Sequence, residues 1–187
     1  MTLALDRAAA WRLLCEWTQS DSLRKHALAV EAAMRYYARR FGEDETLWGI
    51  TGLLHDLDYE RHPTPEEHPA RGVAALAEAG YPAVMLEAIQ GHAPYLGVPR
   101  RTRMAKALYA VDELTGLIIA VALVRPSRKL ADVEVRSVLK KFKDKGFARG
   151  CNREEILQAA EEFGVPWEEH VGHVLKALQE NAAALGL

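Results

Sequence analysis

Apolar side chains recur every three or four positions along most of the chain, which is the spacing of one face of an α-helix. The stretch from Leu23 to Phe41 shows this spacing without interruption. Glycine and proline fall between the periodic segments, and no Asn-Gly or Asp-Gly pair marks a hairpin turn. The pattern therefore predicts an all-α protein.

Capping residues and the positions of glycine and proline set the expected helix ends. The predicted helices cover about residues 3–18, 23–41, 43–56, 66–79, 82–92, 102–124, 133–144, 153–164 and 166–185. Residues 107–124 are long and apolar enough to span a bilayer, but Asp112 and Glu113 lie near their middle, which favours a buried core helix. No internal repeat or linker is visible, so we expect one compact multi-helix bundle over residues 1–187.

The composition is that of an ordinary globular protein. Of the 187 residues 49% are hydrophobic and 27% are charged, which argues against disorder and against a disulfide scaffold. Cys15 and Cys151 are the only cysteines, too few for a thiolate metal cage and in keeping with a reducing cytosol. Asp6, Arg7 and Arg12 interrupt any signal-peptide core. We expect a cytoplasmic protein without membrane attachment, in which any metal site uses His, Asp and Glu.

A net charge of −2 conceals a basic middle third of the chain. Residues 100–149 hold 13 Lys and Arg against 5 Asp and Glu. Part of this segment could attract a phosphorylated or polynucleotide ligand: Arg100, Arg101, Arg103, Lys106, Arg125, Arg128 and Lys129. The lysines of residues 140–145 are expected to form a solvated helix face. Because the overall charge gives little support to nucleic-acid binding, a small phosphorylated ligand is the expectation.

Four polar side chains interrupt otherwise apolar helices. His26 and Asp112 each lie within an apolar stripe, whereas Glu113 points about 100° away from Asp112. His55 and Asp56 stand side by side at the end of an apolar helix. A lone His in such a position is more often a hydrogen-bonded core residue, but a buried carboxylate needs a cation. Imidazoles and carboxylates together suit a borderline or hard divalent metal.

This ordered set resembles the HD superfamily of metal-dependent phosphohydrolases, whose signature is a His, a later His-Asp pair and a later Asp on helices of one all-α domain. Here the signature residues are His26, His55, Asp56 and Asp112. The resemblance covers about residues 22–124 and implies an HD-type domain with a C-terminal helical extension over about 125–187. It also implies that these four side chains bind one metal ion.

Some members of the superfamily bind a second metal through two further histidines. His68 and His92 have spacings similar to those in bacterial symmetric diadenosine tetraphosphate hydrolases, and Lys106 resembles a lysine that those enzymes carry. This likeness implies that Asp56 bridges to a second ion completed by both histidines. If there is no second metal, His68 is expected to lie exposed to water in the first turn of its helix. His92 is then expected at the C-terminal end of its helix, where the helix dipole favours a histidine. Residues 53–60 and the segment after Val124 look like a group of uncharacterised predicted HD hydrolases. This resemblance does not identify a substrate.

The resemblance implies a hydrolase that cleaves a phosphate ester or anhydride of a nucleotide or another small phosphorylated compound. The nucleophile would be a metal-bound hydroxide, generated by one or two divalent ions of Mn, Fe, Co, Ni or Zn. Asp56 and Lys106 are the expected catalytic residues, and Lys106, Arg71 and Arg128 the expected substrate contacts. Two alternatives remain open: a dinuclear iron oxygenase of the same fold, and a non-catalytic nucleotide-binding module.

The other three histidines are expected to lie at the surface. His62 falls in a proline-rich loop. His170 and His173 are next to Glu168 and Glu169 on the last helix, which favours ordinary surface pairing.

Overall fold

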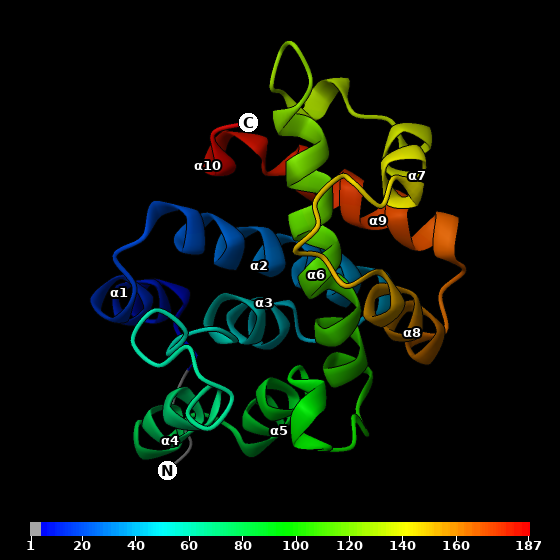
Figure 1. The fold of residues 1–187 in the computed structure, drawn as a ribbon. Coiled ribbons are helices and arrows are strands. Elements are labelled where there is room, and N and C mark those ends of the chain that lie inside the picture. The colour runs from blue at the N-terminus through cyan, green and yellow to red at the C-terminus, as the bar shows by residue number, and fades with distance from the viewer. Residues whose placement is uncertain (1–4) are drawn as a thin grey trace.

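The computed structural model describes residues 5–187, and its regular structure there consists of helices only (Figure 1). The all-α prediction is therefore confirmed. The α-helices are α1 (Arg7–Trp17), α2 (Asp21–Phe41), α3 (Glu45–Leu54), α4 (Ala70–Glu78), α5 (Ala83–Gly91), α6 (Arg103–Leu123), α7 (Val135–Lys143), α8 (Arg153–Phe163), α9 (Trp167–Glu180) and α10 (Ala182–Leu185). Two 3₁₀ turns lie at Pro94–Leu96 and Leu130–Asp132. Residues 3 and 4 of the first predicted helix lie outside the described residues.

Five of the ten α-helices described begin where a short polar side chain accepts a backbone hydrogen bond. Asp6, Ser20, Asp44, Thr102 and Asn152 each accept from an N–H in the first turn of the helix that follows. The glycines that follow α2 and α8 adopt positive φ angles and end those helices. These caps explain why α2, α6 and α8 agree closely with the predicted ranges.

Several predicted helix boundaries are wrong. The first helix begins at Arg7, because Asp6 is extended and caps it, so the predicted helix at Leu5 and Asp6 is absent. The fourth helix begins at Ala70 instead of residue 66, because Pro69 lacks an N–H and disfavours helical backbone at His68. His68 therefore lies in a turn that precedes α4. The last predicted helix is divided at Asn181, whose φ of −117° is not helical, into α9 and α10.

The long helix α6 runs through the middle of the molecule, and α2, α5, α7, α8 and α9 pack against it (Figure 1). Its side chains are buried over most of its length, including Leu108, Leu114 and Leu117 at 0% exposure. This burial confirms the prediction of a core helix. Among the described residues, no helix is long and apolar enough to cross a membrane.

Glycine at position 52 allows α3 to lie close against α2. A Cβ atom on Gly52 would lie 2.9 Å from Met34 Cγ and 3.0 Å from the carbonyl oxygen of Val30. Any side chain at this position would therefore push the two helices apart. Their close contact brings His55, at the end of α3, beside His26 of α2.

His170 joins three helices in the core, so its predicted surface position is wrong. The side chain is 0% exposed. Tyr37 of α2 donates to Nδ1 at 2.6 Å, and Nε2 donates to the carbonyl of Ala110 in α6 at 2.9 Å. Burial lowers the pKa of His170 to about 4 and raises the pKa of Tyr37 above its usual range, so both groups stay neutral. His173 does pair with Glu169, at 3.6 Å.

Candidate metal centre

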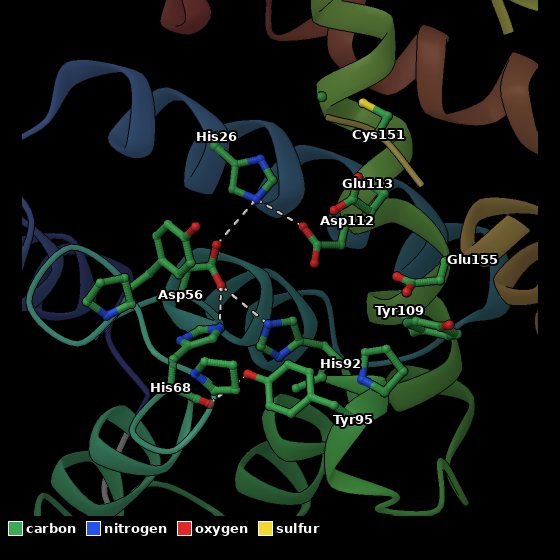
Figure 2. A pocket seen from close by; sticks show the side chains of 16 residues that line it. His26, Asp56, His68, His92, Tyr95, Tyr109, Asp112, Glu113, Cys151 and Glu155 are labelled. Carbon is green, nitrogen blue, oxygen red and sulfur yellow. Dashed lines mark hydrogen bonds and ion pairs between the residues drawn. The ribbon is translucent and has the colours of Figure 1, made fainter. Parts of the chain in front are cut away.

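The six predicted metal ligands converge from five segments of the chain, and Figure 2 shows all of them except His55. They are His26 in the first half of α2, His55 and Asp56 at the end of α3, His68 in the turn before α4, His92 at the end of α5, and Asp112 in the middle of α6. Each comes from the end of a helix or from a helix face that packs on its neighbours. The converging elements therefore fix the positions of these side chains through the core.

One group of ligand atoms consists of His26, His55 and Asp112. The Nε2 atom of His26 lies 3.0 Å from Asp112 Oδ1 and 3.2 Å from His55 Nε2, and His55 Nε2 lies 3.4 Å from Asp112 Oδ1. Atoms that bind one ion at about 2.1 Å are separated by about 3.0 to 3.4 Å in octahedral or tetrahedral geometry. The spacing of this group fits a single divalent ion.

Asp56 turns its two carboxylate oxygens towards different histidines (Figure 2). Oδ2 lies 3.3 Å from His55 Nε2 and 3.6 Å from His26 Nε2. Oδ1 lies 3.3 Å from His92 Nε2 and 3.4 Å from His68 Nε2. A second group of closely spaced ligand atoms comprises His55, Asp56 and His92, and His68 faces the same Asp56 oxygen from outside that group. This arrangement suits a carboxylate that bridges two ions.

Hydrogen bonds on the far side of the rings orient three of the histidines. Nδ1 of His55 donates to the carbonyl of Gly52 at 2.7 Å, and Nδ1 of His92 donates to the carbonyl of Ile89. Nδ1 of His68 donates to a carboxylate oxygen of Asp58 at 2.7 Å. In the neutral form of each ring Nδ1 carries the proton, so the lone pair of Nε2 points towards Asp56, as a metal ligand requires.

Asp58 is a functional residue that the sequence reasoning missed. Its side chain is buried at 0% exposure, and its second oxygen accepts from the backbone N–H of Gly72 at 2.6 Å. That N–H belongs to the first turn of α4, where a negative charge is favourable. A Cβ atom on Gly72 would lie 3.1 Å from Asp58 Cγ, so glycine leaves room for the carboxylate. The sequence feature that could have identified Asp58 is that it is a second carboxylate two residues after Asp56.

The electrostatics of the centre keep its carboxylates ionised. Burial alone would raise the pKa of Asp112, but the charge of His55 and hydrogen bonds from His26 and His55 outweigh it and hold the pKa well below its usual range. His55 and His92 lower the pKa of Asp56 against burial in the same way. The two carboxylates in turn raise the pKa of His55, although burial opposes this. Ionised oxygens and closely facing imidazole nitrogens together form a donor set that fits a divalent cation.

The centre opens into a cavity of about 450 Å³, here named the metal cavity. Besides the ligands, its wall includes Tyr59, Tyr95, Tyr109, Glu113, Cys151 and Glu155. Glu113 was expected to point away from the Asp112 face, yet it lines this cavity, where burial and the charge of Asp112 raise its pKa to about 7. Cys151 and Glu155 come from the C-terminal part of the chain, and only the folded structure could reveal their position.

The structure does not bring the three predicted phosphate contacts into the wall of the metal cavity. Lys106 is partly buried on α6, three residues before Tyr109 and on the same face. Arg71 is largely exposed and lies 3.5 Å from Glu67. Arg128 lines a second cavity that adjoins the first. Their roles as substrate contacts stay predictions.

Comparison with known families agrees with this geometry. The model of the HD domain family matches residues 23–122, which is more than half of the chain. The chain therefore belongs to the HD domain family, whose members are typically metal-dependent phosphohydrolases. A search of curated proteins and a search of solved structures each found no match.

Proposed function

We propose that the protein is a metal-dependent phosphohydrolase that cleaves a phosphate ester or anhydride of a nucleotide or another small phosphorylated compound. The observation that carries this proposal is the position of Asp56, with one oxygen towards His26 and His55 and the other towards His68 and His92. Divalent ions bound there would lower the pKa of water and neutralise charge on phosphoryl oxygens.

The residues of the chain have distinct tasks in this proposal. His26, His55 and Asp112 hold the first ion, His68 and His92 complete the second, and Asp56 belongs to both sites. Imidazole and carboxylate donors suit Mn, Fe, Co, Ni or Zn. Asp58 holds His68 in the tautomer that leaves Nε2 free to bind metal.

No protein nucleophile is needed, although a thiol lines the metal cavity. Burial and then the charge of Glu113 raise the pKa of Cys151, so its thiol stays protonated near neutral pH. A protonated thiol is a poor nucleophile and a poor metal ligand. We therefore assign Cys151 to the wall of the cavity.

The first test is the metal content per chain of wild type, Asp56→Ala and His92→Ala. His62→Ala is a matched control, because His62 pairs with Glu67 outside the metal cavity. We expect about two ions in wild type and in the control, and fewer in both other variants. If wild type holds one ion and only Asp56→Ala loses it, His68 and His92 do not belong to the ligand set. No metal after reconstitution with manganese, iron or zinc would refute the proposal.

The second test measures products from the metal-loaded protein. Hydrolysis of nucleoside phosphates, dinucleoside polyphosphates and phenyl phosphate, followed by chromatography of the nucleotide, phenol and phosphate products, should require metal, and Asp56→Ala should abolish it. Dioxygen consumption by the iron-loaded protein without phosphate release would identify an oxygenase instead. Nucleotide binding without any product would identify a binding module.

A further inference from the structure

A second cavity, also of about 450 Å³, adjoins the metal cavity and is here named the outer pocket. It lies between the first half of α2, the second half of α6 and α10. His26 and Gly116 line both cavities. The volume falls within the range of small-molecule sites, which is about 300 to 1,000 Å³.

Gly116 marks the junction of the two cavities. It lies in the interior of α6, four residues after Asp112, where glycine costs about 1 kcal/mol relative to alanine. A Cβ atom at this position would have no atom within 4 Å, so close packing does not require the glycine. Its missing side chain instead leaves open the space between the outer pocket and the metal ligands.

The wall of the outer pocket combines aliphatic and cationic side chains with one acidic side chain, that of Asp21. Ile119, Leu123 and Leu185 supply the apolar surface, and Lys25 and Arg128 supply the positive charge. Leu123 is 40% exposed, so this apolar surface is only partly covered. A ligand that fits the wall must have an apolar body and an anionic group.

Both cations are available for a ligand. No carboxylate of residues 5–187 forms an ion pair with Arg128, and its backbone adopts a φ of 55°, which is strained for a residue with a side chain. Lys25 pairs with Asp21 at 2.8 Å, but the Asp21 side chain is 83% exposed and such a pair is weak. An anion in the outer pocket would face both positive charges.

The metal cavity is more acidic than the outer pocket. Four carboxyl groups line it, from Asp56, Asp112, Glu113 and Glu155, and no Lys or Arg among the described residues does. Bound ions would compensate Asp56 and Asp112, but Glu155, and Glu113 in its ionised form, would still disfavour a second anionic group there. Such a group would be attracted to the outer pocket instead.

We propose that the outer pocket binds the non-reacting part of the substrate, an apolar body that ends in a second anionic group held by Lys25 and Arg128. This inference rests on the proposed function, which places the reacting phosphoryl group at the metal cavity. Gly116 and Leu123 are separated by about 10 Å along the axis of α6. The substrate class is therefore a phosphorylated compound with a second anionic group at the far end of an apolar body.

The test uses phosphonates, because their P–C bond is not a target of phosphohydrolysis. Methylphosphonate, hexylphosphonate and hexane-1,6-bisphosphonate are titrated into the metal-loaded protein in a calorimeter. We expect the bisphosphonate to bind wild type at least tenfold more tightly than hexylphosphonate. Arg128→Ala and Lys25→Gln should each remove most of that difference. Lys129→Ala is the matched control and should keep it, because Lys129 is exposed and lies outside the outer pocket.

Gly116→Leu tests the junction. This variant should weaken the binding of hexylphosphonate at least fivefold and leave the binding of methylphosphonate unchanged. If the leucine variant does not fold, Gly116→Ala replaces it and should show a smaller effect in the same direction. Metal content and thermal melting confirm that each variant is intact. Three outcomes would overturn the proposal. Wild type could bind the two hexyl compounds with equal affinity, it could bind no phosphonate, or Arg128→Ala could keep the selectivity of wild type. Selective bisphosphonate binding without phosphatase activity would refute only the proposed hydrolase.

Discussion

Replacing Asp58 with asparagine should remove one metal ion and spare the other. Asp58 now accepts two hydrogen bonds, from His68 Nδ1 and from the N–H of Gly72. Asparagine has nearly the same shape, but its amide can accept only one of these bonds and presents an N–H to the other donor. If Nδ1 of His68 loses its acceptor, the proton can move to Nε2, the atom that faces Asp56. A protonated Nε2 cannot bind metal.

The expected magnitude follows from the role of Asp58 beside the ligand. Loss of such an orienting partner weakens metal binding by about 10- to 100-fold, or about 1.4 to 2.7 kcal/mol. Because His68 contacts only the Oδ1 side of Asp56, the loss should fall on the second ion. A competitive titration with a chromophoric chelator measures the affinities for the two metal ions. Urea unfolding in the presence of a chelator measures how much the substitution lowers the free energy of unfolding of the metal-free protein.

The control for this experiment is Asp132→Asn, which changes an exposed carboxylate far from the ligands in the sequence. It should bind both ions as wild type does. Two ions of unchanged affinity in Asp58→Asn would refute the assignment of His68 as a ligand oriented by Asp58. Loss of both ions together would show that the two sites do not form independently.

Two further predictions concern the core that supports the site. Because burial lowers the pKa of His170 to about 4 from an ordinary value of 6.5, the folded chain binds fewer protons than the unfolded chain between these values. Stability should therefore be fully present above pH 6.5 and fall by about 3 kcal/mol as the pH drops to 4, and urea unfolding of His170→Gln should show a shallower fall. Gly52→Ala should destabilise the fold by about 1 to 3 kcal/mol and weaken metal binding, because it separates α2 from α3. Equal metal affinity in this variant would show that the spacing of the two helices does not set the site.

Local patterns in the sequence predict most of the helices and four of the candidate metal ligands, whereas His68 and His92 follow only from the resemblance to the HD superfamily. His26 and Asp112 were recognisable because a polar side chain within an apolar stripe contradicts the pattern around it. The same test could have placed His170 in the core, because it shares helical spacing with Val174 and Leu178, which are both buried. Glu168 and Glu169 beside His170 favour a surface position, but the apolar spacing outweighs them because the face of the helix decides which side chains are buried.

Other parts of the site depend on contacts between distant segments, which no local pattern reveals. Asp58 is recognisable as a partner of His68 only once the turn before α4 is known to place both beside Gly72. The sequence favours Lys106 over Arg128 as a substrate contact, because Lys106 also resembles a lysine of related hydrolases. Their positions differ because the chain turns after α6 and brings Arg128 to the outer pocket.

The walls of the two cavities come partly from outside the segment that matches the family. Residues 23–122 contain all six proposed metal ligands. Cys151 and Glu155 of the metal cavity, and Arg128 and Leu185 of the outer pocket, come from the chain that follows. Metal chemistry depends on the ligands, whereas the choice of substrate depends on the walls. It follows that the family match predicts the reaction type better than the substrate, and that variants in residues 125–187 should change selectivity while leaving the metal content intact.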